Sequence, residues 1–516
     1  MSHERSHVVR SFLVLLTLSF AGTCAHGRDY WVARYGSDTN ACTNKTSDAC
    51  LSLQKGVSVL APGDTLNIGS GVYSEDGGRS PYNTSKTSGW TSTTGQGDIV
   101  SAAVVMDRSG TASLPIIIQG DPSNQAPAII DCGHVYQGKA TYLAGIFTNR
   151  QDYIQFKNFT IRNCMSKGIY DWDRGDDSVD VPDSNEVSVG VLIDGLTIHH
   201  IGGSDNDAGI AMWTTKDWIV RNTHIYDIYG WPPAGRVGTG IHSYGTVNAL
   251  IEHNFIESGS GGSGIYWKDH YVANASTRAP VFESEIRYNM IDVNGLGVCV
   301  CVQPDNEAGE NYIHHNIIRS GGTENNGIRV AMAGASYVTT APQRIEHNLI
   351  IGRDAIDSSG LNFSGTTDVR LRGNIVHNFS AGLVVQNVTA ARPAVLTASD
   401  YNIWGASDVP MLAMLGRYST VLAKNYSNLP SWQAAVVSDT PVLGFSHPDT
   451  HSAQAGIASV IRDFRNGDYR LMPTSPASNL MPDGSNAGPY QYGSEVIGPM
   501  LGSATIPPKA PSLNVQ

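Results

Sequence analysis

The sequence predicts an all-β protein built as a right-handed parallel β-helix, a solenoid in which each coil of the chain stacks on the one before it. Three observations predict this fold: a short motif that recurs between residues 161 and 386, alternation of apolar and polar residues at period two, and an abundance of turn-forming glycine. A coil of about 30 residues cannot bury its own apolar face, but stacked coils form one continuous core.

The recurring motif is an apolar residue, an asparagine three positions later and, further along, a glycine followed by Ile, Val or Leu. Successive asparagines of six copies lie 32, 35, 27, 32 and 26 residues apart. These asparagines are Asn222, Asn254, Asn289, Asn316, Asn348 and Asn374, and a looser early copy spans Ile161–Asn163. Unequal spacing is typical of a solenoid whose insertions become loops on one side.

Each residue type in the motif has an expected structural role. The asparagine should occupy a sharp turn between strands, because asparagine tolerates left-handed backbone geometry, and stacked asparagines can hydrogen-bond from coil to coil. The glycine should permit the opposite corner, and the crossovers should be right-handed. A leucine-rich repeat or a sandwich is the alternative, but the helical segments and leucine register of the former are absent.

The first residues have the features of an export signal. Arg5 and Arg10 precede an apolar run at 12–20 and small residues at 21–27, a pattern typical of a secretory signal and too short for a membrane span. No later segment is long and apolar enough to cross a bilayer. The sequence therefore predicts a soluble protein, secreted or periplasmic, and no nucleotide-binding or zinc motif appears in it.

One elongated solenoid accounts for the length of the chain, so we expect a monomer of one architecture rather than several domains. The expected divisions are a signal peptide at 1–27, an N-terminal cap and first coils with an insert at 28–113, the β-helix core at 114–400, C-terminal coils and a cap at 401–497, and a flexible tail at 498–516.

Six cysteines remain after the signal, an even number that suits an oxidising compartment. Cys42 with Cys50 would close a small loop, and Cys132 with Cys164 would tie two early coils. Cys299 and Cys301 would share one face of a strand, with α-carbons about 6.5–7 Å apart, the limit for a disulfide. We favour a structural pair there over a metal or redox site.

Both ends of the chain contain motifs that resemble those of a known group of proteins. Near the N-terminus a Gly-Ser-Asp turn (36–38) precedes a helical pattern at 52–60 and then Pro-Gly-Asp-Thr (62–65) and Gly-Val-Tyr (71–73). These motifs, with the segment at 468–477, resemble the caps of secreted right-handed β-helix proteins of the pectate-lyase superfamily. The resemblance spans roughly residues 29 to 493, and it implies the fold more specifically than the reaction.

The strand that follows each glycine is where we expect chemistry. The apolar residue after the glycine should point inward, so the alternate residues should point outward. Adjacent coils lie about 4.8 Å apart, so these outward residues would line one exposed groove. Aromatic and basic side chains together suit sugar stacking and binding of acidic groups. The candidate residues are Trp213, His242, Tyr244, Tyr266, Lys268, Arg329 and Asn362.

Lys268 is the leading candidate for a catalytic base. Abstraction of the proton α to a uronate carboxyl needs a base over the ring and a cation that stabilises the enolate-like intermediate. Arg287 or Arg329 would supply the cation, by donating to the leaving oxygen or clamping the carboxylate. The pattern resembles β-helical chondroitinase and alginate lyases, although their Asn/Glu/Glu calcium-ligand run has no clear counterpart here. The alternative is a surface ion pair of Lys268 with Asp269 or Glu252.

Histidines offer a second arrangement, in which His242 and a neighbouring Tyr244 or Tyr266 act as base and acid. Three other histidines recur beside the turn asparagine, and we expect these to be hydrogen-bonders between coils rather than catalytic groups. They are His253, His315 and His347.

Two acidic groups complete the set of candidate sites. Asp176 and Asp177 lie in an acid-rich insert, where oxygen ligands at high density would suit Ca²⁺, although a solvated loop is the commoner outcome. Asp205 and Asp207 would lie at the edge of the groove, as further metal ligands or as the carboxylate pair of a hydrolase. The motifs of polygalacturonases are absent, which places hydrolysis second.

These features together favour a secreted polysaccharide lyase that cleaves an acidic, uronate-containing polysaccharide by β-elimination, with Ca²⁺ as a possible cofactor. A glycoside hydrolase or a uronate C5-epimerase on the same scaffold is the first alternative, and a non-catalytic sugar-binding surface protein is the second.

Overall fold

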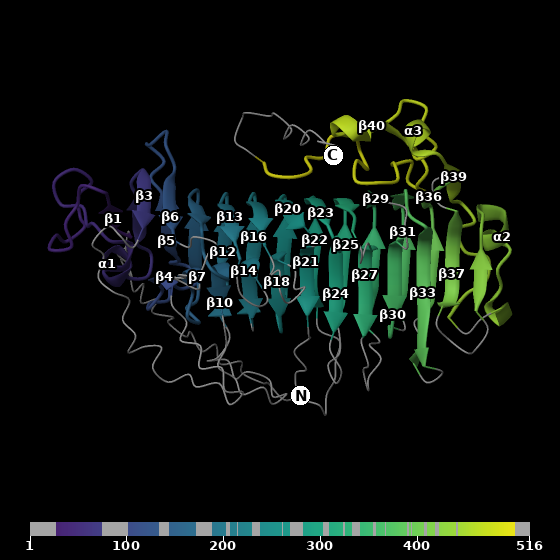
Figure 1. Ribbon diagram of the computed structural model, residues 1–516, viewed down its shortest axis with the longest axis horizontal. Coiled ribbons are helices and arrows are strands. Elements are labelled where there is room, and N and C mark those ends of the chain that lie inside the picture. The colour runs from purple at the N-terminus through teal and green to yellow at the C-terminus, as the bar shows by residue number, and fades with distance from the viewer. Residues whose placement is uncertain are drawn as a thin grey trace, which may run out of the picture.

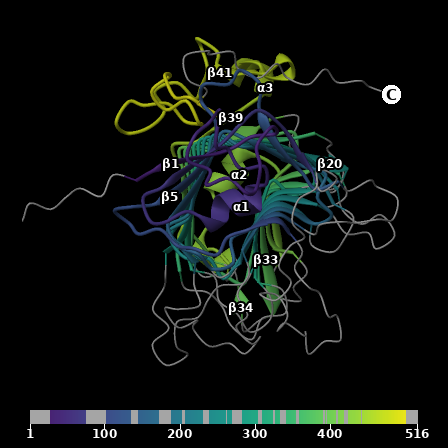
Figure 2. The same cartoon turned by 90° about the vertical axis from the view of Figure 1, so that its left-hand side faces the viewer.

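The computed structural model shows three long parallel sheets that wind around one shared interior (Figures 1 and 2). The structure describes residues 27–74, 102–133, 144–171, 188–202, 207–213, 215–229, 238–260, 262–268, 282–302, 309–322, 326–332, 341–353, 358–366, 368–389, 392–393, 395–406, 410–417, 423–439 and 442–500.

Sheet A has twelve strands, and neighbouring strands pair in parallel. In spatial order they are β1 (Asp29–Val32), β2 (Thr65–Ile68), β5 (Ile116–Gly120), β8 (Ile154–Lys157), β12 (Leu192–Asp194), β16 (Ile219–Arg221), β19 (Ala249–Glu252), β22 (Phe282–Arg287), β25 (Glu310–His314), β28 (Gln343–Glu346), β31 (Val369–Arg372) and β35 (Leu396–Asp400).

Sheet B also has twelve strands, and those from β3 to β36 each follow a sheet A strand along the chain. They are β3 (Gly71–Ser74), β6 (Ala128–Asp131), β9 (Thr160–Arg162), β13 (Thr197–Ile201), β17 (His224–Ile228), β20 (Phe255–Ser260), β23 (Met290–Asn294), β26 (Ile317–Ser320), β29 (Leu349–Gly352), β32 (Ile375–His377), β36 (Ile403–Gly405) and β39 (Ala453–Ala455).

Sheet C is the third wall, and its strands contain the glycine half of the motif. They are β4 (Ala102–Val105), β7 (Ala144–Phe147), β10 (Lys167–Asp171), β14 (Ala208–Trp213), β18 (Thr239–Tyr244), β21 (Ser263–Lys268), β24 (Val298–Val302), β27 (Asn326–Met332), β30 (Ser359–Ser364), β33 (Ala381–Thr389), β37 (Met411–Arg417) and the antiparallel β38 (Lys424–Tyr426).

The remaining elements are short. Two more pairs of strands are β11 (Ser188–Val189) with β15 (Thr215–Lys216) and the antiparallel β40 (Ile461–Asp463) with β41 (Asp468–Leu471), and β34 (Arg392–Pro393) pairs with β33. The helices are α1 (Leu53–Ser58), α2 (Leu429–Gln433) and α3 (Ile457–Val460), with 3-10 turns at η4 (Val437–Asp439) and η5 (Phe464–Asn466).

The asparagine repeat forms the predicted ladder of hydrogen bonds. Six asparagines between sheets A and B are 0% exposed, and each amide nitrogen donates to the amide oxygen of the next at 3.0–3.2 Å. They are Asn254, Asn289, Asn316, Asn348, Asn374 and Asn402. Because every rung is shielded from water, the ladder holds adjacent coils at a fixed spacing.

The expected left-handed geometry falls on the residue before the asparagine rather than on the asparagine itself. His253, His315 and His347 have φ of 54–55°, whereas their asparagine neighbours are not left-handed. The Asn222 copy is shifted by one position: Asn222 itself has φ of 52°, and Thr223 takes the ladder position opposite Asn254. The side-chain amide of asparagine is used for pairing between coils, so any residue that tolerates φ near 55° can make the turn before it.

The motif glycine has a role different from the expected one. Gly209 does not have positive φ, but a Cβ built on it would lie 2.5 Å from Ile225 Cγ2 and 2.8 Å from Gly240 O. No side chain fits at that distance. Glycine is therefore required for close packing of the strand against the opposite wall, and not for a left-handed corner.

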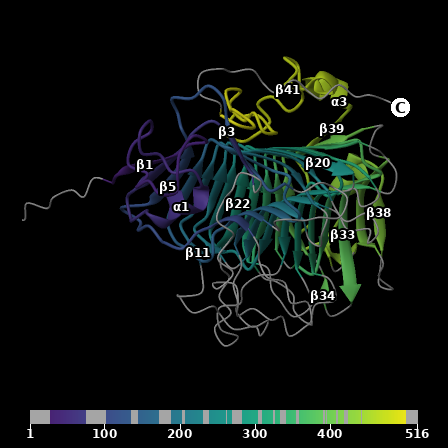
Figure 3. The ribbon, with the colours of Figure 1, turned by 60° about the vertical axis from the view of Figure 1, so that its left-hand side comes forward.

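Residues 457–500 form a segment, called the C-terminal segment here, that returns across the outer face of sheet B (Figures 1 and 3). Six sheet B residues in one register row form an apolar cluster with residues of this segment, such as Val460, Tyr469 and Met481. The row is Phe255, Met290, Ile317, Leu349, Ile375 and Ile403. This second core lies outside the main one.

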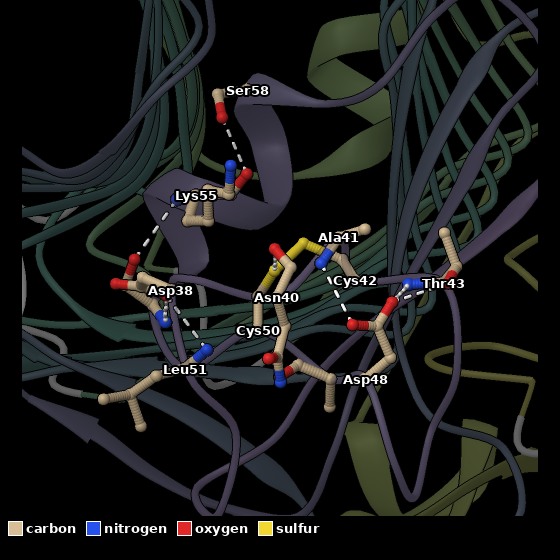
Figure 4. The surroundings of a disulfide bond; sticks show 12 residues. Asp38, Asn40, Ala41, Cys42, Thr43, Asp48, Cys50, Leu51, Lys55 and Ser58 are labelled. Carbon is tan, nitrogen blue, oxygen red and sulfur yellow. Dashed lines mark hydrogen bonds between the residues drawn. A yellow bond between two sulfur atoms is a disulfide. The ribbon is translucent and has the colours of Figure 1, made fainter.

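Two predicted disulfides are confirmed. Cys42 pairs with Cys50 beside helix α1 (Figure 4), and Cys132 pairs with Cys164 between neighbouring coils. Cys299 is also disulfide-bonded, which agrees with the structural interpretation of that position. Among the described residues, no helix has both the length and the apolar character needed to span a membrane.

Candidate functional site

The register of sheet C brings most of the predicted site residues onto one face. His242 pairs with Tyr266, Tyr266 with Cys299, Cys299 with Arg329, and Arg329 with Asn362. A second row places Trp213 beside Tyr244 and Tyr244 beside Lys268. Their strand neighbours Ile241, Ile265 and Ile328 are buried in the main core, so the described side chains of both rows point outward. Six residues of these two rows form what we call the outer strip. They are Trp213, His242, Tyr244, Tyr266, Arg329 and Asn362.

Aromatic rings are in continuous contact along the N-terminal half of this face. Ring centroids lie 5.3 Å apart for Tyr170 and Trp213, 5.9 Å for Trp213 and His242, and 5.5 Å for His242 and Tyr266, and all three pairs meet edge to face. Trp213 also lies 5.9 Å from Tyr244, which is 38% exposed. Edge-to-face contacts fix the rings relative to one another and leave parts of their faces and edges for a ligand.

The outer strip is less exposed than the sequence predicted. His242 is 4% exposed, and two other residues of the same register row are fully buried, namely Ala211 next to His242 and Cys299 next to Tyr266. His242 is therefore a packed ring between Trp213 and Tyr266 in this conformation. Tyr244 is the exposed member, and Trp213, Tyr266, Arg329 and Asn362 are half-buried.

The C-terminal half of the strip is polar. Asn362 donates to Asn326 Oδ1 at 3.1 Å, and Gln386 donates to Asn362 Oδ1 at 3.0 Å. These bonds orient the Asn362 amide next to Arg329, its register neighbour. A guanidinium beside an oriented amide is suited to bind carboxylate and hydroxyl groups.

Arg287 is not part of this face. It lies in β22 of sheet A, where its guanidinium binds Glu252 at 2.7 Å and Glu285 at 2.6 Å. Burial lowers the pKa of Arg287, but the two carboxylates outweigh it, so the pKa is raised. The expectation that Arg287 acts with Lys268 does not agree with this placement, because strands of a β-helix that are adjacent in sequence lie on different walls.

Three of the expected ligand residues lie outside the described residues: Asp176, Asp177 and Asp205. Lys268 is placed by its backbone only, in register with Tyr244. Asp207 is buried, 1% exposed, and its carboxylate raises the pKa of Lys167. Within the described ranges, no group of three or more His, Cys, Asp or Glu side chains is arranged to hold a metal ion.

Lys167 is a residue of this face that the sequence did not reveal. It begins β10, is 3% exposed, and donates from Nζ to Ser166 Oγ at 2.7 Å. Its ammonium lies 5.9 Å from the ring centroids of both Tyr170 and Trp213. Burial lowers its pKa to about 8, against the opposing effect of Asp207. The sequence predicts outward residues only after each motif glycine, whereas Lys167 directly precedes Gly168. Including the position before each glycine would have identified Lys167.

Sheets A and C differ strongly in the charge of their strand residues. In a chain of net charge −12, the strands of sheet C contain one acidic residue, Asp171, and five basic ones. The basic residues are Lys167, Lys268, Arg329, Arg417 and Lys424. On sheet A, acidic and basic side chains alternate from coil to coil and pair, as Arg221 does with Asp194 at 2.8 Å. Sheet C is thus the more basic of these two sheets, which favours an acidic ligand, although Lys424 binds Asp439 at 3.0 Å.

The repeated histidines stack between coils instead of hydrogen-bonding to one another. The rings of His253, Tyr288, His315 and His347 lie 5.0–5.1 Å apart in succession, next to the C-terminal segment. Burial lowers the pKa of His315 to about 4 and that of His347 to about 3. His315 Nε2 contacts Gln491 Oε1 of the C-terminal segment at 3.0 Å. These histidines are structural, as predicted, but the interaction between coils is ring stacking.

The three parallel sheets and the repeat define a right-handed parallel β-helix protein. The family model described as "Right handed beta helix region" matches residues 144–341, which lie within the predicted β-helix core.

Solved structures similar to this chain include a pectate lyase, with 13% identity, 90% of this chain and 97% of that chain covered, and a TM-score of 0.48. An alginate lyase from Paenibacillus sp. has 17% identity, 66% and 99% coverage and a TM-score of 0.34. A glycoside hydrolase has 9% identity, 68% and 94% coverage and a TM-score of 0.40. No curated protein matches the sequence.

Proposed function

We propose that the protein is a secreted polysaccharide lyase that cleaves a uronate-containing polysaccharide by β-elimination on the outer face of sheet C. The observation that carries the proposal is the excess of basic over acidic residues in the strands of this sheet, side by side with a continuous row of aromatic rings. Aromatic faces bind the apolar faces of sugar rings, and cations bind the carboxylates.

The reaction breaks two bonds and leaves one new double bond. A base removes the proton at C5 of the uronate, the electron pair forms the C4–C5 double bond, and the C4–O glycosidic bond breaks as its oxygen takes a proton from a general acid. Arg329 would neutralise the carboxylate at C5 and so stabilise the enolate-like intermediate. Lys268 would be the base, and Tyr244, its register neighbour, would be the general acid.

The proposal includes a bound Ca²⁺, held by aspartates of the segments around residues 176 and 205. Asp176, Asp177 and Asp205 would supply hard oxygen ligands near this face, and a bound Ca²⁺ would add positive charge at the substrate carboxylate. Asp207 is not assigned to this calcium site, because its buried carboxylate interacts electrostatically with the Lys167 ammonium.

Incubation of the purified mature protein with alginate, pectate and glycosaminoglycans tests the reaction class. A lyase produces an unsaturated uronate and rising ultraviolet absorbance. New reducing ends without absorbance would identify a hydrolase, and inversion at C5 seen by NMR without cleavage would identify an epimerase. No change in any of the three would overturn the proposal in favour of a binding protein.

Arg329→Met tests the assignment of the site. We expect kcat/KM to fall by about 10²-fold or more, the range typical of lost electrostatic stabilisation. Arg372→Met is the matched control, because Arg372 is exposed on sheet A, beside Tyr401. Equal activity of both variants would contradict the assignment of sheet C and leave the fold unaffected.

A further inference from the structure

Lys167 is a buried cation next to the proposed binding face. Its Nζ lies 5.9 Å from the centroids of two rings, Tyr170 and Trp213, that meet edge to face at 5.3 Å. At 3% exposure the side chain cannot exchange its contacts freely with water. A cation in such a position interacts with the ring quadrupoles, and the interaction is strongest where water is excluded.

Trp213 connects this cation to the outer strip. Its ring contacts His242 and Tyr244, each at 5.9 Å, and Tyr244 is the most exposed ring of the strip. The orientation of Trp213 therefore determines the surface that Tyr244 and Tyr266 present. Lys167 lies behind that surface, so it does not touch a ligand.

We infer that Lys167 is a positioning residue for sugar binding, whose protonated amine holds Tyr170 and Trp213 in the orientation that the acidic polysaccharide requires. The inference rests on the proposed function, since it takes the outer strip as the sugar-binding face. Loss of the Lys167 proton would remove the cation–π interaction and leave the rings free to reorient, which would weaken binding.

The surroundings of Lys167 allow it to lose its proton near neutral pH. Burial lowers its pKa to about 8, and the Asp207 carboxylate, just before β14, acts in the opposite direction. Asp171 on the same strand accepts from Arg150 N and from Thr148, and the strand on the other side, β7, has no charged side chain. His242 and Tyr244 on β18 are the titratable rings that contact the other side of Trp213, each at 5.9 Å. Because a lysine is charged below its pKa, the ammonium should be present at pH 6–7 and largely absent at pH 9.

Calorimetric titration at 4 °C with a uronate oligosaccharide that the wild type cleaves measures this effect. Turnover is suppressed in every variant by Lys268→Ala, which removes the proposed base and keeps Arg329 to bind the carboxylate. We expect the affinity of the parent protein, which is inactivated but keeps Lys167, to fall about tenfold between pH 7 and 9.5. Lys167→Met should bind about tenfold more weakly already at pH 7 and show no further fall. Lys167→Arg, which stays charged throughout, should bind well at both values.

Lys157→Met is the matched control, because Lys157 is a half-buried lysine at the end of strand β8, on sheet A. It should keep the affinity and pH dependence of the parent. A Lys167→Met protein that behaves like Lys157→Met overturns the inference while the lyase activity of the wild type stands. If the wild type acts on no polysaccharide, the proposed function fails and the inference fails with it.

Near-ultraviolet circular dichroism provides a readout that needs no substrate. The contacting rings should give a signal that changes with a midpoint near pH 8 in the wild type and in Lys157→Met, and that is constant from pH 6 to 9.5 in Lys167→Arg. If Lys167→Met does not fold, as judged by far-ultraviolet dichroism and a cooperative thermal transition, Lys167→Arg decides alone. A pH 8 transition that survives in Lys167→Arg overturns the inference.

Discussion

The outer faces of sheets B and C differ although the same coils build both. On sheet B the outward row from Phe255 to Ile403 is apolar and lies beneath the C-terminal segment. On sheet C the outward row has aromatic, basic and amide side chains, and Tyr244 reaches solvent. Both sheets direct Ile, Val and Leu into the same interior.

This difference shows how a solenoid separates stability from binding. Inward positions are constrained by packing in every coil and by the asparagine ladder from Asn254 to Asn402. An outward position contacts its neighbours in adjacent coils and whatever covers the face. A row of outward residues can therefore become either a second core or a binding face without any change in the coil. The C-terminal segment covers one row, and the proposed site uses the other.

The largest effect should come from the ladder, which both faces share. Asn316→Ala removes the oxygen that accepts from the backbone and amide nitrogens of Asn289. The amide nitrogen keeps the carbonyls of Ile251 and Arg287 as acceptors, but the buried backbone nitrogen is left without its partner. We expect a loss of about 3 kcal/mol or more in the free energy of unfolding, measured with denaturant. Asn425→Ala, at an exposed position in β38, should change stability by less than about 0.5 kcal/mol. Equal effects would mean that the ladder is not what spaces the coils.

A cavity in the second core should affect stability and leave binding intact. Leu349→Ala removes a fully buried side chain between sheet B and the C-terminal segment. The expected cost is about 3 kcal/mol, typical of a buried leucine, with unchanged affinity for the polysaccharide. Loss of affinity in a variant that stays folded would show that the two faces are coupled.

Acid should weaken the contact of the C-terminal segment with the histidine stack. The pKa of His315 is lowered to about 4 and that of His347 to about 3, so the folded state stays neutral while the unfolded chain, with pKa near 6.5, binds protons. Stability contributed by these neutral rings is present above pH 6.5 and is lost as pH falls from 6.5 toward 4. The fall in Tm between pH 7 and 4.5 should be smaller in His347→Phe, which keeps a ring without the titration.

His451→Phe is the control for that measurement. The His451 side chain is 62% exposed and bound to Asp400, away from the buried stack. Its substitution should leave the dependence of Tm on pH close to that of the wild type. A His347→Phe protein with the wild-type dependence would assign the acid sensitivity to the carboxylates instead.

The smallest effect on stability, with a larger effect on binding, should come from the outer strip. Tyr266→Ala removes a half-buried ring that contacts His242 at 5.5 Å. We expect a loss of about 1 kcal/mol in stability and at least a tenfold loss of affinity. Tyr35→Ala, at a ring that is 65% exposed in the N-terminal region, should change neither. A stability loss as large as that of Leu349→Ala would mean that Tyr266 belongs to a core.

Much of the fold was predictable because the same sequence motif recurs in successive coils of the β-helix. The period of the motif, the asparagine ladder and the pairs Cys42–Cys50 and Cys132–Cys164 follow from residue types and spacing. The site was predictable to the level of the register, which aligns His242, Tyr266 and Arg329. Arg287 was predicted as a possible partner of Lys268, but it lies in the asparagine half of the motif and therefore in β22 of sheet A, whereas Lys268 lies in β21 of sheet C.

The sequence by itself determined the coil. Period-two alternation and the motif asparagine are local properties of the chain, and they recur from one repeat to the next. Only the tertiary structure decided which outer face is covered and which stays accessible. That outcome depends on a single return of the chain, residues 457–500, across sheet B. It also placed Lys167 between Tyr170 and Trp213, a buried contact across two coils that no pattern within one repeat contains.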